Sequence, residues 1–292
     1  MIVTTKHGCK VFKPDPPALP TPPAFQGVPE PGHVYQCDAL ALLKAMPDNS
    51  VDAIITDPPY GLAKYKPLEV APGKRNGHGG AYKRVNEEWD LDVPVDWMPE
   101  ATRVLRPGGS VIIFNGVIGR IEIGFYALQL GWRLLAEIAW FKPDAPPNFT
   151  GRCVSQSTEK FFWYCPSGSN WTYNRKYAKQ VNGGVNFRDV WTFHAPRGED
   201  RLHPTQKPFL LMDRIVQLFT KSGDLIVDPF GGSGTTAVAA RNAGRRYITG
   251  DLSATYCDIM RRRLSEAFTV NMFETPSTES EKAEQQSIFD AA

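Results

Sequence analysis

The sequence has no long apolar run. No uninterrupted apolar segment approaches the roughly 20 residues that a membrane-spanning helix needs. The first residues, MIVTTKHGCKVFK, also lack the apolar stretch of a secretory signal. These absences predict a cytoplasmic protein that has no membrane partner.

Cysteine is scarce, and charges of the two signs nearly cancel. The five cysteines are widely scattered and form no Cys-x-x-Cys pair, which argues against a disulfide framework and against a zinc site. We therefore expect no bound metal. A net charge of +2 does not identify a nucleic-acid-binding protein by itself, so any basic surface has to be local.

Both ends of the chain lack the patterns of a folded domain. Residues 1–32 are predicted to form a disordered arm, because the prolines between residues 14 and 31 prevent helix and sheet from propagating. Residues 269–292 are polar and acidic with few large apolar side chains, which is typical of a disordered tail. The folded domain is expected to cover residues 33–268.

Short apolar runs alternate with helical patterns inside this domain. Strand-like runs, rich in β-branched and aromatic residues, occupy residues 33–37, 52–56, 109–114, 133–141, 159–165, 224–228 and 245–250. Helical patterns occupy residues 38–46, 95–105, 117–130, 208–219, 235–243 and 253–268. The alternation predicts an α/β fold with a doubly wound, mostly parallel sheet of about seven strands, whose ligands bind beyond the carboxyl ends of the strands.

A glycine-rich loop, DPFGGSGTT, follows the strand-like run that ends at Asp228. Its glycines let the backbone approach a ligand closely, and free amides at the start of a helix favour an anionic group. Asp251 ends the next strand-like run about 20 residues later, where an acidic side chain can accept both hydroxyls of a ribose. A tight turn without a ligand and a helix-capping Asp251 are the alternatives. Together the two features favour a ribose-containing cofactor.

A second unusual loop, Asp57-Pro58-Pro59-Tyr60, begins where the apolar run at residues 52–56 stops. Two prolines make the turn rigid and leave carbonyls without local amide partners. A carboxylate, a carbonyl and an aromatic ring are then fixed at the ligand edge of the sheet. They suit a planar heterocycle with an exocyclic amino group. For the tetrapeptide alone, a rigid turn with a capping aspartate is the alternative.

The motifs TDPPYG, HPTQKP and DPFGGSGTT together make residues 35–264 resemble a known family. This family is the S-adenosylmethionine-dependent DNA amino-methyltransferases, which modify N6 of adenine or N4 of cytosine. The order of the motifs resembles that of its circularly permuted β group. The resemblance implies a Rossmann-like methyltransferase fold, S-adenosyl-L-methionine as cofactor, double-stranded DNA as partner and pairing of two copies as a homodimer.

The resemblance also implies roles for individual residues. The catalytic residues would be Asp57, Pro58, Pro59 and Tyr60, with Asp57 also beside the cofactor. Asp251 would hold the ribose hydroxyls, and Lys207 or nearby amides would face the carboxylate of the cofactor. The remaining cofactor-binding residues would be Asp38 and Ala39 at the adenine ring, His203, Thr205 and Gln206 at the methionine end, and Asp228, Pro229, Phe230, Gly231, Gly232, Ser233, Gly234 and Thr235 in the glycine-rich loop.

The expected mechanism follows from the chemistry of an aromatic amine. The nitrogen is conjugated with its ring, and two acceptors that draw its protons out of plane would make it a better nucleophile. Asp57 and the Pro58 carbonyl supply these acceptors, and the rest is in-line positioning. The base must leave the duplex, and stacking on Tyr60 would return about 1 to 3 kcal/mol of the cost.

We favour adenine N6 as the target because Asp57, rather than Ser, opens the tetrapeptide. Cytosine N4 is the nearest alternative, since the same acceptors serve it. Methylation of RNA or of a protein amide is less favoured because Asn-Pro-Pro-Tyr is the usual motif there. A binding protein without turnover is disfavoured by the intact motifs. Methylation of a cytosine ring carbon is excluded, because none of the cysteines follows a proline.

Two basic segments are candidates for DNA contacts. Residues 62–88 are predicted to form a mobile basic loop, with contacts from Lys64, Lys66, Lys74, Arg75, Lys83 and Arg84. Residues 165–202 are the candidate target-recognition insertion, with contacts from Arg175, Lys176, Lys179 and Arg188, and with Trp171, Tyr173, Tyr177 and Trp191 interleaved. A solvated surface loop is the alternative for the first segment. Between these segments, Lys142 is a candidate for the base pocket, whereas core packing is favoured for Trp140.

Overall fold

The computed structural model describes residues 2–4, 10–12, 25–61, 90, 92–145, 154–197, 201–203 and 205–266. The predicted basic loop at 62–88, with its six lysine and arginine residues, lies outside this range, as do the predicted acidic tail and most of the arm. Within the arm, β1 (Ile2–Thr4) and β2 (Lys10–Phe12) pair as a two-stranded antiparallel sheet. The described helices include none with the length and apolar character that crossing a bilayer requires.

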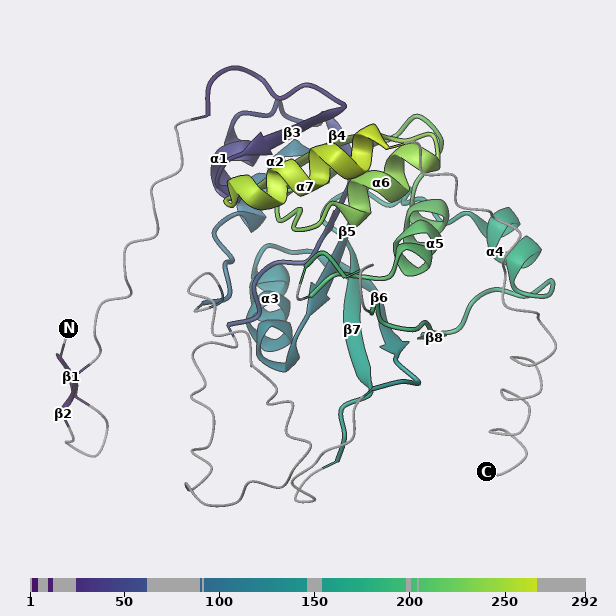
Figure 1. The fold of residues 1–292 in the computed structure, drawn as a ribbon, viewed down its shortest axis with the longest axis horizontal. Helices are drawn as coiled ribbons and strands as arrows, with labels where there is room; N and C mark the ends of the chain where they lie inside the picture. Colours follow the sequence, from purple (N-terminus) through teal and green to yellow (C-terminus); the bar gives the residue numbers. More distant parts are fainter. Residues whose placement is uncertain are drawn as a thin grey trace.

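The main sheet of the described chain has eight strands in the order β3-β10-β9-β4-β5-β7-β6-β8 (Figure 1). Neighbouring strands are parallel except at β7, which runs antiparallel to both β5 and β6. The strands are β3 (His33–Gln36), β4 (Val51–Thr56), β5 (Leu105–Asn115), β6 (Arg133–Phe141), β7 (Thr158–Cys165), β8 (Val190–Thr192), β9 (Leu225–Asp228) and β10 (Arg246–Asp251).

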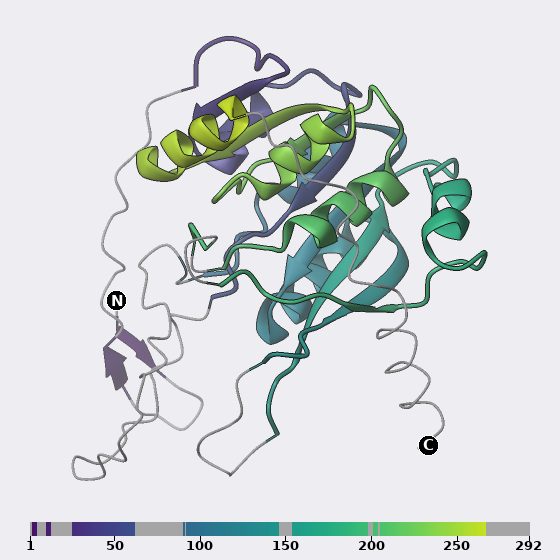
Figure 2. The same cartoon turned by 45° about the vertical axis from the view of Figure 1, so that its right-hand side comes forward.

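Helices cover both faces of this sheet. Apolar side chains of α1 (Ala39–Lys44), α2 (Met98–Val104) and α3 (Val117–Gln129) pack on one face. The other face is covered by α4 (Arg175–Val181), α5 (Phe209–Phe219) and α6 (Thr235–Asn242). In Figure 2 the green helices α5 and α6 and the yellow-green α7 (Ala254–Ser265) lie along the sheet one after another. The predicted doubly wound α/β fold is confirmed.

All seven predicted strands and all six predicted helices are present. Besides the β1–β2 pair in the arm, the added elements lie in residues 165–202. There the structure adds α4, which has 7 residues, and β8, which has 3. Such short elements carry too few residues for a periodic pattern to stand out. Trp191 of β8 is buried at 3% exposure and contacts Phe161 and Phe219, so part of this insertion belongs to the core.

The register of the antiparallel strand decides which side chains reach the ligand edge. Asn115 at the carboxyl end of β5 lies opposite Lys160, which is near the start of β7. The first residues of β7 therefore lie at the same edge as the last residues of β4, β5, β9 and β10. This places Glu159 of β7 beside the loop that follows β4.

Candidate active site

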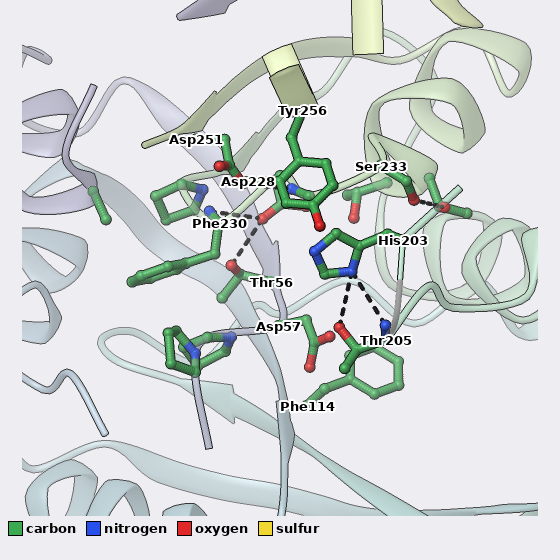
Figure 3. A pocket seen from close by; sticks show the side chains of 18 of the residues that line it. Thr56, Asp57, Phe114, His203, Thr205, Asp228, Phe230, Ser233, Asp251 and Tyr256 are labelled. Atoms are coloured by element: carbon green, nitrogen blue, oxygen red, sulfur yellow. Dashed lines mark hydrogen bonds between the residues drawn. The ribbon is translucent and has the colours of Figure 1, made fainter. Parts of the chain in front are cut away.

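The loops beyond β3, β4, β9 and β10 line one pocket together with residues from the HPTQKP motif (Figure 3). Every residue that the sequence analysis assigned to the cofactor or to catalysis lines this pocket, except Gly234. Further lining residues, which the sequence analysis did not assign, are Cys37, Thr56, Asp90, Phe114, Met212, Thr236, Leu252, Ser253 and Tyr256.

The glycine-rich turn packs directly on β10 and α7. A Cβ atom at Gly231 would lie 2.3 Å from Thr249 Oγ1 and 2.7 Å from Met260 Sδ, so a larger residue does not fit. Gly234 does not line the pocket, and its absent Cβ gives room to Met260, whose Cγ would lie 2.7 Å away. The turn therefore needs Gly231 and Gly234 for packing. Gly232 and Gly234 also adopt positive φ angles, of +52° and +77°, which favour glycine.

Two aspartates frame the turn, of which Asp228 is buried and Asp251 is half-buried. Asp228 Oδ1 accepts hydrogen bonds from Thr56 Oγ1 (2.8 Å) and from the amide of Phe230 (3.2 Å). Burial raises the pKa of Asp228 to about 6, against these bonds, which favour the ionised form. Asp251 accepts the Gly232 amide on Oδ2 (2.9 Å) and the Ser253 amide on Oδ1 (2.8 Å). Both carboxylates are thus held in fixed positions at the pocket wall.

The HPTQKP motif closes another side of the pocket. The ring of His203 packs edge-on against Tyr256 of α7, with centroids 4.3 Å apart. Thr205 donates its amide to His203 Nδ1 (3.2 Å), so the proton of the neutral ring resides on Nε2. Burial and the nearby positive charges lower the pKa of His203 to about 4, so the ring is neutral near pH 7. His203 is therefore an uncharged wall of the pocket.

The loop after β4 is fastened by a residue that is distant in sequence. One oxygen of the buried Asp90 accepts the backbone amides of Tyr60 (2.6 Å) and Gly61 (2.8 Å). The Tyr60 ring lies against the backbone at Gly116, where a Cβ atom would come within 2.9 Å of the ring. The prolines fix one end of the loop, and Asp90 fixes the other.

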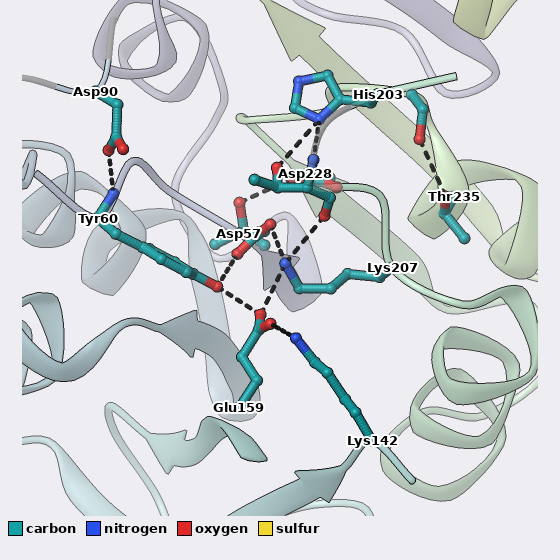
Figure 4. A network of polar contacts seen from close by, with 12 residues as sticks. Asp57, Tyr60, Asp90, Lys142, Glu159, His203, Lys207, Asp228 and Thr235 are labelled. Carbon is teal, nitrogen blue, oxygen red and sulfur yellow. Dashed lines mark hydrogen bonds and ion pairs between the residues drawn. The ribbon is translucent and has the colours of Figure 1, made fainter. Parts of the chain in front are cut away.

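Asp57 belongs to a network of five polar side chains (Figure 4). Its Oδ1 accepts the Tyr60 hydroxyl at 2.5 Å, and its Oδ2 accepts the ammonium of Lys207. Glu159 Oε1 is reached by the same two donors, with Tyr60 at 2.8 Å and Lys207 at 3.0 Å. Glu159 Oε2 accepts Lys142 Nζ at 2.7 Å. Two carboxylates thus face two ammonium groups and one phenol.

The two carboxylates of the network differ in their tendency to ionise. Burial raises the pKa of Asp57, against the opposing effect of Lys207. Burial disfavours ionisation of Glu159 too, but Lys207 and Lys142 outweigh it and lower the pKa of Glu159 to about 2. Burial also acts against the charge of Lys207, whose pKa is nevertheless raised by the two carboxylates. Glu159 therefore stays ionised, whereas Asp57 is the carboxylate better suited to receive a proton.

The family resemblance implied that Lys207 or nearby amides face a carboxylate of the cofactor, whereas in the structure the Lys207 ammonium contacts Asp57 and Glu159. Glu159 and Asp90 are further residues of the site that no sequence motif indicated. Glu159 comes at the start of a strand, and only the antiparallel direction of β7 brings that start to the ligand edge. Lys142, a candidate for the base pocket, lies in the network, and Trp140 is in the core as expected.

The candidate DNA-contacting residues of the insertion are not gathered at the pocket. Arg175, Lys176, Lys179 and Arg188 are all exposed. However, α4 follows Asn174, whose amide donates to the carbonyl of Leu218 at the end of α5, so α4 begins at the edge opposite the pocket (Figure 1). The insertion returns to the pocket edge only after β8, where Arg197 Nη2 contacts Asp144 Oδ2 at 2.7 Å.

Comparison with known proteins identifies the family of this chain. The family model described as DNA methylase, of the N6/N4 type, matches residues 51–262. This match runs from β4 to α7 and so includes the network at Asp57 and the glycine-rich turn. The chain belongs to the N6/N4 DNA methylase family.

Individual relatives agree with this assignment. The methylase is 34% identical over 241 residues to the type II methyltransferase M2.DpnII of Streptococcus pneumoniae, covering 78% of this chain and 87% of that protein. It is 31% identical over 253 residues to the type II methyltransferase M2.LlaDCHI of Lactococcus lactis subsp. cremoris, covering 82% and 91%. The crystal structure of the M1.HpyAVI–SAM complex superposes with a TM-score of 0.60 at 25% identity, covering 80% of this chain and 99% of that one.

Proposed function

We propose that this site-specific DNA methyltransferase uses S-adenosyl-L-methionine to methylate the exocyclic N6 of adenine in a base flipped out of double-stranded DNA. The observation that carries the proposal is the position of Asp57 in the same pocket as the glycine-rich turn and Asp251. An acceptor for an amino group and a cradle for a nucleoside cofactor thus share one cavity. Asp57, where a serine is more frequent among relatives acting on cytosine N4, favours adenine.

The pocket residues fit S-adenosyl-L-methionine, the ligand in the complex of the structural neighbour M1.HpyAVI. Asp251, anchored by two amides, keeps free lone pairs for the ribose hydroxyls. Asp38 caps α1 by accepting the Ala41 amide at 3.0 Å, and this fixed position supports its proposed place beside the adenine ring. When bound, the cofactor supplies an electrophilic methyl group. We propose no metal, because transfer from a sulfonium needs none.

In the proposed mechanism the protein chain positions the target amine and polarises its N–H bonds. Asp57 and the Pro58 carbonyl accept the two N–H bonds of the target amine, which localises its lone pair. Tyr60 supports the extruded ring. On receiving the methyl group that the bound cofactor would supply, the amine nitrogen would become cationic and would have to release a proton. Asp57, whose pKa is raised by burial, is the nearest group to take it.

DNA would approach the edge of the sheet at which the pocket lies. The basic residues between 62 and 88 continue directly from the catalytic loop, so we propose that they contact phosphates there. Arg197 and the neighbouring His194 are exposed at the same edge. Arg188 lies between α4 and β8 and is retained as a candidate contact. The residues of α4, at the opposite edge, are expected to contribute less.

A methylation assay with base identification tests the proposal. The full chain would be incubated with labelled S-adenosylmethionine and plasmid DNA, and modified positions would be mapped by single-molecule sequencing. We expect N6-methyladenine at one short sequence. N4-methylcytosine would replace the target base in the proposal, and label on RNA or protein but not on DNA would overturn it.

The homodimer and the cytoplasmic location stay predictions. Sedimentation equilibrium of the full chain would test the first. The exposed apolar side chains Ile121, Phe125 and Leu128 of α3 are the places where charged substitutions would be most informative.

A further inference from the structure

The acceptor that methyl transfer needs is already occupied by two donors. Asp57 holds the Tyr60 hydroxyl on one oxygen and the Lys207 ammonium on the other. A carboxylate that binds an ammonium attracts a neutral amine hydrogen less strongly, since the positive charge offsets its field. A target amino group at Asp57 therefore competes with both donors.

Each of these donors also reaches a second acceptor. Glu159 Oε1 lies 2.8 Å from the Tyr60 hydroxyl and 3.0 Å from Lys207 Nζ. A phenol hydroxyl has a single proton and serves only one carboxylate at a time. Burial and the two carboxylates raise the pKa of Tyr60 well above its usual value, so this proton is retained. The Tyr60 hydroxyl thus donates either to Asp57 or to Glu159, but not to both at once.

Glu159 is held in place independently of Asp57. Its Oε2 accepts Lys142 Nζ, and the Lys142 ammonium lies 4.2 Å from the centre of the Trp140 ring. The backbone amide of Lys142 donates to the Ser157 carbonyl at 2.7 Å, which ties this end of β6 to the start of β7. With Oε2 fixed in this way, Oε1 stays directed at the two donors that it shares with Asp57.

We propose that Glu159 is a positioning residue for methyl transfer, which takes the Tyr60 hydroxyl and the Lys207 ammonium from Asp57 when the target amino group binds. The exchange needs only rotation of a hydroxyl and a small shift of an ammonium, because both donors already lie between the two carboxylates. No proton is transferred between residues in this exchange. The two negative charges of Asp57 and Glu159 still balance the two positive charges of Lys207 and Lys142. The proposal rests on the role proposed above for Asp57.

The main test is Glu159→Gln, measured as the single-turnover rate of methyl transfer between about pH 7 and pH 9.5. Without the second anion, Lys207 remains on Asp57, and the rate at pH 7.5 should fall on the order of 10- to 100-fold, as expected for one charge-assisted hydrogen bond. The rate should then rise with pH. Lys207 would face a single carboxylate and lose its proton more easily, which frees Asp57.

The matched control is Glu137→Gln. Glu137 lies on β6, pairs with Lys160 of β7 and also approaches Arg120 Nη1 of α3 at 3.6 Å, away from the network. Its rate and pH profile should equal those of the wild type. If Glu159→Gln does not fold, Glu159→Asp serves instead, because its shorter side chain keeps the charge but does not reach both donors. That variant should be slower than the wild type with an unchanged pH profile.

The outcomes separate the inference from the proposed function. A wild-type rate for Glu159→Gln or Glu159→Asp, or a loss in Glu159→Gln that is the same at every pH, would overturn the role of Glu159. Transfer that persists in Asp57→Asn would instead overturn the role of Asp57. Loss in Asp57→Asn together with a loss in Glu159→Gln that recovers at high pH supports both.

Discussion

Replacing Asp57 by alanine tests the proposed chemistry at a single residue. Asp57→Ala should lower the rate of methyl transfer at least on the order of 100-fold, the effect of removing a preorganised polar group at a reacting atom. Cofactor affinity should change little, because the bonds of Asp228 and Asp251 do not involve Asp57. Lys207 keeps Glu159 as its counter-ion, so the variant should fold. Single-turnover methylation and equilibrium cofactor binding would measure the two effects.

The control for this variant lies in the same chain. Asp15→Ala changes the aspartate of the other Asp-Pro-Pro, in the predicted arm, and should leave methylation unchanged. Equal loss in both variants would contradict the assignment of catalysis to the loop after β4.

The raised pKa of Asp228 predicts that cofactor affinity depends on pH. Its pKa is raised by burial to about 6 from a usual value of 3.8, so it loses most of its charge between pH 7 and pH 5. A cationic cofactor beside it should therefore bind less tightly as the pH falls through about 6, by up to about tenfold per pH unit. Asp228→Asn should flatten this dependence while keeping an acceptor for Thr56.

Without cofactor, the effect concerns the stability of the fold, which Asp228 raises and does not lower as the pH falls. Because the folded-state pKa of Asp228 is raised, its contribution to stability is fully present below pH 3.8 and is lost as the pH rises through about 6. The difference in melting temperature between Asp228→Asn and the wild type, followed over pH 4 to 7, would measure this contribution. A constant difference would show that Asp228 does not titrate in this window.

At the scale of elements, the junction of β9 and α6 depends on contact with β10 and α7. Gly231→Ala would place a methyl group 2.3 Å from Thr249 Oγ1 and should cost about 1 to 3 kcal/mol of unfolding free energy. It should also weaken cofactor binding, because the turn has to move. Urea unfolding and a binding isotherm would measure both.

Gly124→Ala provides the comparison. Gly124 is in α3, and the nearest atom to an added Cβ is the Tyr164 hydroxyl at 3.9 Å. Alanine should fit and stabilise the helix by about 0.5 to 1 kcal/mol. Similar destabilisation at both positions would show that the contact with β10 and α7 does not limit residue 231.

The strands and loops also show which parts of the site could be predicted from the sequence. The apolar runs of β4 and β9 and the turns that follow them predicted the pocket, because in parallel sheets such turns emerge at one edge. The partner of Asp57 was not predictable in this way. Lys207 lies 150 residues further on, and Glu159 reaches the edge only because β7 is antiparallel. Strand order and direction decide such contacts, and the periodicity of a single sequence does not contain them.

At the scale of the whole molecule, the positions of basic residues predict how binding to DNA depends on salt. Neutralising the six lysine and arginine residues between 62 and 88 should weaken binding and lower the slope of log K against log salt by about 5, if each contacts one phosphate. Arg175→Gln, Lys176→Gln and Lys179→Gln together should change the slope much less, because α4 begins at the opposite edge. Fluorescence anisotropy at several salt concentrations would measure both slopes, and a larger effect from α4 would place the DNA on the other side of the molecule.

Asp90 joins two positions of the chain that are far apart in the sequence. The amides of Tyr60 and Gly61 donate to its carboxylate, so positions 61 and 90 lie side by side although they are 29 residues apart in the sequence. Closing a longer segment costs little, about 0.6 kcal/mol for each doubling of length. Inserting residues between positions 61 and 90 should therefore cost little stability and leave the contacts of Asp90 intact.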